Sequence, residues 1–200
     1  MPRRVDHRRR RDEIAVLVWQ IVAEQGMGAV TLRSIASCGG ISVGRVQHYF
    51  PTREAIVLYG LEAMIDGAAR GFRESTLGSD PRTALTALLI HSIPRTEARR
   101  LGSKVWYAYV AESVASQAIA DLLRSTLQGV EDLVTAMIQA IRDPASVRVE
   151  DVDERDVARM LLAAADGLVY RVLVNQLSER DADDTVLGLI NAVLGPEKGP

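Results

Sequence analysis

The chain has 200 residues, of which 48 % are hydrophobic and 25 % charged, and this composition is that of a folded globular protein. A single cysteine, Cys38, excludes an internal disulfide framework and any zinc site built on several cysteines. The charged N-terminus lacks the apolar core of a signal peptide, and no apolar run reaches the length of a membrane-spanning helix. We therefore expect a soluble, cytoplasmic protein that makes no membrane contact.

Charge is distributed unevenly along the chain. The net charge is −2, but residues 1–55 hold nine arginines against five acidic residues, a local balance of +4. The remaining residues hold 15 basic against 21 acidic side chains, a balance of −6. A basic segment attracts polyanions, whereas an acidic segment repels them. The N-terminal quarter is therefore the part that we expect to meet a nucleic acid.

Apolar residues recur at helical spacing along the whole chain without any alternating strand pattern, which predicts an all-α fold of about nine helices. The first helix is expected over residues 8–25 and ends at Gly26. Thr31 and Ser42 are expected to cap two short helices, and Thr52 caps a longer one that starts at Arg53. The apolar face of the first helix consists of Ile14, Leu17, Val18, Ile21 and Val22.

Five more helices are expected in the remainder of the chain. Asp80 and Pro81 begin the first of them, and Ser116 can cap a long helix that ends at Asp143–Pro144. A polar loop then leads to Asp153, which can cap the next helix. The expected ranges are 80–93, 97–115, 116–142, 153–177 and 182–194.

Residues 31–50 have the organisation of a helix-turn-helix, in which a glycine-containing turn joins two short helices and the second enters the major groove. Gly40 relieves the tight turn. The positions Arg45, Gln47 and His48 can donate to bases or phosphates. Two short helices with a glycine turn also occur in helical proteins that bind no DNA, so the spacing alone leaves both interpretations open.

Five segments in this order make residues 8–60 resemble the DNA-binding head of the TetR family of transcriptional regulators. The resemblance implies a dimeric regulator, a repressor that leaves its palindromic double-stranded operator when a small effector binds. It implies a DNA-binding domain over residues 1–52, a helical regulatory and dimerisation domain over 53–200, and no cofactor. The segments are RDEI at 11–14, VAEQG at 22–26, VTLRSIA at 30–36, GISVG at 40–44 and HYFPTRE at 48–54.

The resemblance also implies roles for individual residues. Thr31 matches an N-cap that helps to bind a backbone phosphate, and Arg33 follows it with a side chain free to reach the DNA backbone. Val43, Gly44 and Arg45 match the groove-entering start of the recognition helix. Within that helix, Arg45 is the expected base reader, because a guanidinium can donate to guanine in bidentate fashion.

Residues at the end of the motif complete the expected interface. Tyr49 matches an aromatic residue near the phosphates, and Arg53 matches a basic residue that touches a phosphate together with the amide end of its helix. Gln47 stands where the family commonly has tyrosine, and Gly39 stands where it commonly has alanine. Gln47 removes a phosphate-contacting hydroxyl but adds an amide that can pair with adenine, which changes the expected operator rather than the binding mode.

WYAY at 106–109 and ADGL at 165–168, followed by Arg171, are similar to the BetI-like subgroup of regulatory domains. We expect a small hydrophobic or amphipathic effector, cationic if Asp166 faces it; alternatively, Asp166 is a buried acid satisfied by Arg171. The expected pocket residues can equally be core residues that leave no cavity. They are Met64, Phe72, Leu89, His91, Trp106, Tyr109, Met137 and Asp166.

The last two helices are expected to pair two protomers about a two-fold axis. Small residues at positions 163, 164 and 167 allow close approach between helices. On the last helix, an apolar stripe is expected to be covered by the partner protomer. The stripe consists of Val186, Leu189, Ile190 and Val193.

Three further questions concern the role of the basic N-terminus, an enzymatic activity and a protein-interaction function. The four arginines from Arg8 to Arg11 form either a phosphate-binding arm or an ordinary solvated terminus. An enzyme is not expected, because the sequence has no nucleophile motif or phosphate-binding glycine loop, and His7, His48 and His91 have no metal-ligand spacing. A helical protein-interaction module that binds no DNA is the remaining alternative, and a salt-dependent shift of DNA distinguishes the regulator from it.

Overall fold

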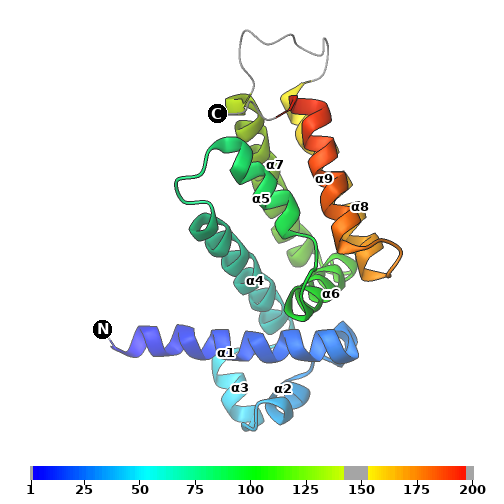
Figure 1. Cartoon of the computed structure of the whole chain (residues 1–200). Helices are drawn as coiled ribbons and strands as arrows, with labels where there is room; N and C mark the ends of the chain where they lie inside the picture. Colours follow the sequence, from blue (N-terminus) through cyan, green and yellow to red (C-terminus); the bar gives the residue numbers. More distant parts are fainter. Residues whose placement is uncertain (1, 142–152, 197–200) are drawn as a thin grey trace. The chain divides into compact units, whose positions relative to one another are not determined.

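The computed structural model describes residues 2–141 and 153–196, with side chains from His7 onward, and these ranges form nine α-helices, a short 3-10 helix and no strand (Figure 1). The all-helical prediction is confirmed. The helix end expected at Asp143–Pro144 and the polar loop before Asp153 lie outside the described residues.

Contacts divide the chain into two compact units, residues 1–71 with 101–124 and residues 72–100 with 125–200. This division differs from the sequence-based boundary after residue 52. The difference arises because residues well beyond position 52, such as Leu61, Val105 and Leu123, are buried in one core with the N-terminal helices.

The first unit is built on a long N-terminal helix. Four residues of its predicted apolar face, Ile14, Val18, Ile21 and Val22, are buried, whereas Leu17 is only half-buried. Short helices α2 and α3 both pack on this face. The elements of the unit are α1 (Pro2–Gln25), the 3-10 helix η1 (Met27–Ala29), α2 (Leu32–Cys38), α3 (Val43–Tyr49), α4 (Arg53–Ser75) as far as Gly71, α6 (Glu97–Glu112) from Leu101, and the start of α7 (Gln117–Ile141).

A glycine permits close contact between α4 and α6. A Cβ atom on Gly60 of α4 would lie 2.5 Å from the hydroxyl oxygen of Tyr109 on α6. The Gly60 carbonyl also accepts a hydrogen bond of 3.0 Å from Nε1 of Trp19 on α1. Any larger residue at position 60 would push these helices apart.

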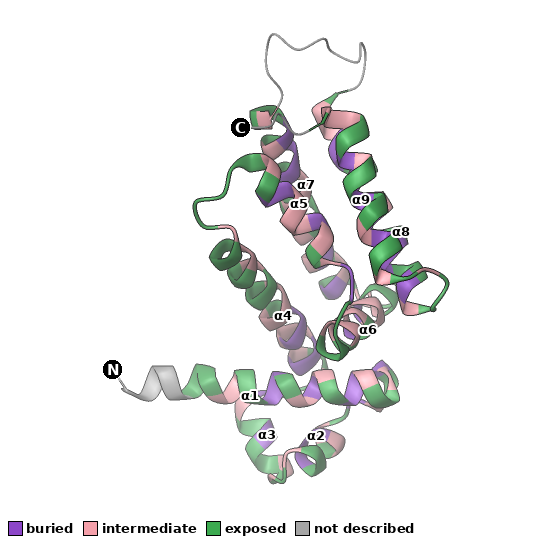
Figure 2. Ribbon diagram, in the orientation of Figure 1, coloured by how far each residue is buried: buried purple, intermediate pink, exposed green. Residues whose placement is uncertain are grey.

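The second unit contains α5 (Pro81–His91), the remainder of α7, α8 (Glu154–Leu173) and α9 (Glu179–Leu194), and α9 packs against both α5 and α8. Asp80 caps α5 as expected by accepting from the amides of Arg82 and Thr83. The helix α9 begins three residues earlier than expected, because the Ser178 hydroxyl accepts from the Asp181 amide and so caps the helix there. The burial pattern on these helices is shown in Figure 2.

Asp153 precedes α8 but makes no side-chain capping bond. Two ion pairs join α8 to α7: Glu131 lies 2.7 Å from Arg155 and 3.1 Å from Arg159. Among the helices of the described ranges, none is long and apolar enough to cross a membrane.

Candidate nucleic-acid interface

The helix α2 begins with a reciprocal cap. The Thr31 hydroxyl accepts from the Ser34 amide at 3.0 Å, and the Ser34 hydroxyl accepts from the Thr31 amide at 2.9 Å. The two bonds satisfy amides that the first turn of a helix otherwise leaves unpaired. The predicted cap at Thr31 is therefore confirmed, and it determines where α2 starts. Arg33, two residues later, has an exposed side chain.

The turn between α2 and α3 requires its second glycine. Gly40 has a φ of +59°, a backbone conformation that L-residues with a Cβ rarely adopt. The Ile41 amide then donates to the Ala36 carbonyl at 3.0 Å and closes the turn. The Ser42 hydroxyl accepts from the Arg45 amide at 3.2 Å and caps α3 as predicted. Local hydrogen bonds thus determine the direction in which α3 leaves the turn.

The outward face of α3 is polar. Val46 is fully buried and anchors the helix to the core. Gly44 and His48 lie opposite Val46 at helical spacing, Arg45 and Gln47 flank them, and all four are exposed. No atom lies within 4 Å of a Cβ built on Gly44, so the fold itself does not require glycine there. A seven-residue helix with this face has the donors and the open surface that contact with base edges demands.

Aromatic rings join the start of α1 to the end of α3. The rings of His7 and Tyr49 have centroids 4.9 Å apart, and those of His48 and Tyr49 are 5.0 Å apart. Tyr49 is half-buried, consistent with an aromatic residue at the edge of the interface.

No group of three or more His, Cys, Asp or Glu side chains within the described ranges is arranged to hold a metal ion.

The Arg53 guanidinium, for which a phosphate contact is predicted, is engaged by the protein itself. The Arg53 guanidinium donates to the carbonyl oxygens of Val30 at 2.9 Å and Met27 at 3.0 Å, and it pairs with Glu112 at 3.4 Å. Its side chain is half-buried as a result. These bonds satisfy carbonyls of the turn around η1, so Arg53 supports the helix-turn-helix from inside. The sequence pattern did not reveal this role because the three partners lie 23 to 59 residues away.

The four arginines at positions 8–11 do not behave as one group. Arg8 pairs with Asp66 at 3.5 Å, and Arg9 and Arg10 pair with Glu13 at 3.2 and 2.6 Å. The hydrogen bond from Arg10 is the main reason why the pKa of Glu13 is lowered. Arg10 and Arg11 are both half-buried, but the guanidinium of Arg11 lies over the aromatic rings of Phe50 and Tyr59. Only the first three arginines remain candidates for a phosphate-binding arm.

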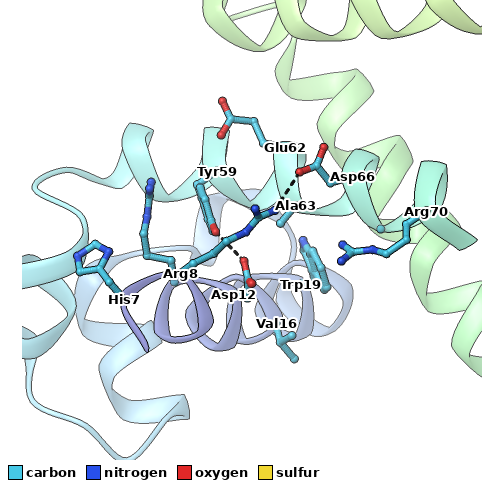
Figure 3. Close-up of a pocket in the computed structure, with 12 residues that line it drawn as sticks. His7, Arg8, Asp12, Val16, Trp19, Tyr59, Glu62, Ala63, Asp66 and Arg70 are labelled. Atoms are coloured by element: carbon cyan, nitrogen blue, oxygen red, sulfur yellow. Dashed lines mark hydrogen bonds and ion pairs between the residues drawn. The ribbon is translucent and has the colours of Figure 1, made fainter. Parts of the chain in front are cut away.

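A groove of about 570 Å³ lies between α1 and α4 in the first unit (Figure 3). Figure 3 shows Asp12 and Tyr59 facing each other, and the Tyr59 hydroxyl donates to Asp12 at 2.6 Å. Burial and this hydrogen bond together raise the pKa of Tyr59 to about 12, so the hydroxyl keeps its proton at neutral pH. The hydrogen bond between these two residues joins α1 to α4. No sequence motif identified them, because they stand 47 positions apart on separate amphipathic helices.

The eight residues expected to line an effector pocket are divided between the two units. Tyr109 is fully buried, and its hydroxyl has no hydrogen-bond partner among the described residues. Burial raises the pKa of Tyr109, and its side chain packs in the core of the first unit. Leu89 is likewise a core residue. Met64 and Trp106 lie in the first unit with Tyr109; Phe72, Leu89, His91, Met137 and Asp166 lie in the second.

Two titratable members of this set, His91 and Asp166, lie at the surface. His91 Nδ1 lies 3.1 Å from an Arg99 guanidinium nitrogen. Partial burial is the main reason why the pKa of His91 is lowered, and the positive charge of Arg99 lowers it further. Partial burial raises the pKa of Asp166. The residue as a whole is exposed on α8.

The apolar stripe expected at a dimer interface is only partly available. Val186 and Ile190 are 2 % and 1 % exposed, because α5 and α8 of the same protomer cover them. Leu189 and Val193 are half-buried. Val186 and Ile190 are therefore core residues of the single protomer, and that part of the prediction is wrong.

A different apolar face is open on α8. Met160, Tyr170 and Val174 are 58 %, 59 % and 52 % exposed. Ala163 and Gly167 are exposed between them, and the spacing of the five positions places them along one side of the helix. This face, residues 160, 163, 167, 170 and 174, is called the α8 face below. Small residues at its centre let a second helix approach closely.

Comparison with known proteins agrees with this architecture. A family model described as the C-terminal domain of BetI-type transcriptional repressors matches residues 81–195. The HTH-type transcriptional regulator PksA of Bacillus subtilis is 24 % identical over 176 residues, which cover 88 % of this chain and 84 % of PksA. The HTH-type regulator BetI of Stenotrophomonas maltophilia is 25 % identical over 177 residues, covering 86 % and 85 % of the two chains.

Solved structures show the same fold. A transcriptional regulator from Rhodococcus sp. RHA1 superposes with a TM-score of 0.80 at 25 % identity, covering 94 % of this chain and 99 % of the regulator. A regulator from Saccharomonospora viridis, solved in complex with choline, has a TM-score of 0.82 at 23 % identity, covering 92 % and 96 %. The family model spans more than half of the chain, and the helix-turn-helix precedes it in the expected place. The chain is therefore a helix-turn-helix transcriptional regulator, not an enzyme, and it belongs to the TetR family with a BetI-type C-terminal domain.

Proposed function

We propose that this chain represses transcription by binding a palindromic operator as a homodimer, with α3 of each protomer in the major groove. The exposed face of α3 is the observation that carries the proposal. Arg45 and Gln47 supply the donors that distinguish guanine and adenine, and Gly44 leaves room for the DNA. Thr31 and Arg33 are exposed at the start of α2, and we propose that they contact the flanking backbone. The functional boundary remains near residue 52, where the helix-turn-helix ends.

Selection from a random pool of duplexes tests this proposal. The full-length protein should enrich a near-palindrome whose half-sites lie about one helical turn, roughly 34–36 Å, apart or a multiple of that distance. Affinity for the selected site should fall steeply as salt rises, because each neutralised phosphate releases counterions. Enrichment of no sequence, or binding that does not respond to salt, would leave the helical protein-interaction module as the better account.

The homodimer is proposed to form through α8 and α9, with the α8 face at its centre. An apolar stripe with a small residue in its middle supports this assignment, because a self-complementary two-fold contact places each stripe against its own copy. Leu189 and Val193, which are half-buried on α9, extend the same contact.

A DNA-binding role also implies that the protein acts in the compartment that holds the chromosome.

The effector is proposed to be a small amphipathic cation. BetI regulators and a choline-bound regulator are among the similar proteins, and Asp166 supplies a carboxylate at the surface of α8. An effector that binds the DNA-free form better must weaken operator binding by the same factor.

The test of the effector compares choline with its uncharged isostere 3,3-dimethyl-1-butanol in an operator-binding titration. Choline should lower the apparent affinity for the operator, and the neutral alcohol should not. Asp166→Asn should remove the response to choline while operator binding without effector is retained. An equal response to both molecules would show that charge is not recognised, and no response to either would exclude choline as the effector.

A further inference from the structure

Arg11 stands apart from the basic run to which it belongs in the sequence. Its guanidinium carbon lies 3.9 Å from the centroid of the Tyr59 ring and 4.7 Å from the centroid of the Phe50 ring. At these distances a cation is attracted by the electron-rich faces of both rings. The three preceding arginines form ion pairs with acidic residues, whereas the guanidinium of Arg11 lies over two aromatic rings.

The two rings belong to different parts of the DNA-binding head. Phe50 directly follows α3 and is only 1 % exposed, so its position determines where the recognition helix ends. Tyr59 lies on α4, and its ring centroid is 5.3 Å from that of Phe50. The residue next to Arg11, Asp12, accepts a hydrogen bond of 2.6 Å from the Tyr59 hydroxyl. One turn of α1 thus holds α4 through Asp12 and contacts the end of α3 through Arg11.

The environment of Arg11 indicates that the rings hold it in place. Its Nε atom is buried and has no hydrogen-bond partner among the described residues. A buried donor without a partner is unfavourable, so another interaction must offset its cost. Two adjoining rings beneath a partly desolvated guanidinium supply such an interaction, and cation–π attraction is stronger where water is excluded.

We propose that Arg11 is a positioning residue for operator recognition: the cation over the adjoining rings of Phe50 and Tyr59 fixes the C-terminal end of α3 and thereby the approach of Arg45 to the bases. This inference rests on the proposed DNA-binding function. Because α3 has only seven residues, a displacement of its end is transmitted to every side chain on its face. Base contacts depend on such alignment, whereas phosphate contacts by flexible side chains depend on it less.

The competing role, a direct phosphate contact, predicts a different salt dependence. Loss of one phosphate contact weakens all DNA alike and makes the plot of log K against log salt shallower by about 0.9. Loss of a positioning residue weakens the operator selectively and leaves that slope unchanged. The ratio of operator affinity to affinity for unrelated duplex therefore separates the two roles.

The experiment compares Arg11→Met with Arg9→Met in the full-length protein. Because Arg9 is a candidate for the phosphate-binding arm, Arg9→Met is the reference for a phosphate role, and any effect of it should be equal on both duplexes. Methionine keeps an unbranched apolar stem but removes the cation, and Arg9 carries the same charge on the same helix with an exposed side chain. Affinities for the selected operator and for an unrelated duplex are measured over a salt series, after circular dichroism has given the folded fraction. Arg11→Met should bind the operator about tenfold more weakly, with unrelated duplex changed less than about twofold. Arg11→Lys, which restores a cation, should recover most of the loss.

Each other outcome has a definite meaning. Equal loss on both duplexes with a shallower slope would make Arg11 a phosphate contact and overturn the proposal. Unchanged operator affinity of the folded fraction would reduce Arg11 to a packing residue. If Arg11→Met does not fold, Tyr59→Leu compared with Tyr59→Phe tests the same ring, since only leucine removes the aromatic face; equal operator binding by these two would also overturn the proposal. A wild-type protein that selects no operator would instead refute the proposed function.

Discussion

The exposed faces of α3 and α8 differ in chemistry although both belong to helices anchored by a buried apolar side. The α3 face carries Gly44, Arg45, Gln47 and His48, all of them exposed. The α8 face carries Met160, Tyr170 and Val174 around a central glycine. Donors and positive charge suit a polyanion, whereas an apolar stripe suits a protein surface. Burial thus identifies the side of each helix that packs within the chain, and the chemistry of the opposite side indicates the partner.

The largest expected effect comes from blocking the α8 face. No atom lies within 4 Å of a Cβ built on Gly167, so Gly167→Lys fits the single protomer, and lysine is a better helix former than glycine. The variant should be a folded monomer, because the substitution acts twice at a two-fold interface. Loss of bivalent binding should weaken the operator complex by about a hundredfold or more. Light scattering and an operator-binding assay measure the two quantities.

Gly129→Lys is the matched control for Gly167→Lys. Gly129 is an exposed glycine within α7 that likewise has no atom within 4 Å of a built Cβ. This variant should remain dimeric and bind the operator as the wild type does. If the two variants behave alike, the protomers pair elsewhere.

Removal of the expected base reader should have the next largest effect. Arg45→Ala should cost about 1–3 kcal/mol of operator binding and relax the preference at one base position, because the guanidinium is a bidentate donor to guanine. Arg33→Ala should weaken all duplexes alike and reduce the salt slope by about one. Binding assays on operator variants with single-base changes measure the base preference of each variant. An unchanged base preference for Arg45→Ala would mean that α3 is oriented differently in the groove.

Arg53→Ala should affect folding rather than the salt dependence of DNA binding. The substitution leaves the carbonyl oxygens of Met27 and Val30 without this donor, at a cost of about 1–3 kcal/mol in the free energy of unfolding. Urea denaturation measures this change, and Glu112→Gln serves as the control that removes only the ion pair. A shallower salt slope without loss of stability would restore the phosphate contact that the sequence resemblance implies.

The smallest expected effect is that of a substitution at Gly44, which should stabilise the fold but weaken operator binding. Gly44→Ala should raise the free energy of unfolding by about 0.5–1 kcal/mol, because alanine is the better helix former and nothing lies within 4 Å of its Cβ. The added methyl group occupies the centre of the α3 face, so operator affinity should fall by several-fold. Urea denaturation and operator titration of the same sample test both signs. A variant that is more stable and binds as well as the wild type would show that DNA does not approach Gly44 closely.

Features that depend on residues close together in the chain could be predicted from the sequence. The caps at Thr31, Ser42 and Asp80 were predictable, because each bond spans only two or three residues. The glycine turn at Gly40 and the apolar spacing of α1 were predictable for the same reason. These local signals were sufficient for the all-helical fold, and together with the order of the motif segments they indicated the helix-turn-helix and the family.

Which side chains of one kind are exposed for a partner depends on long-range packing, which the sequence pattern does not contain. Arg45 and Arg53 stand in the same family motif, yet one is exposed and the other donates to carbonyls more than 20 residues away. Val186 and Ile190 form a helical stripe that suits a core as well as an interface, and only the packing of α5 and α8 against α9 made them core. Helical periodicity shows that a side is apolar but contains no information on whether the covering helix comes from the same chain.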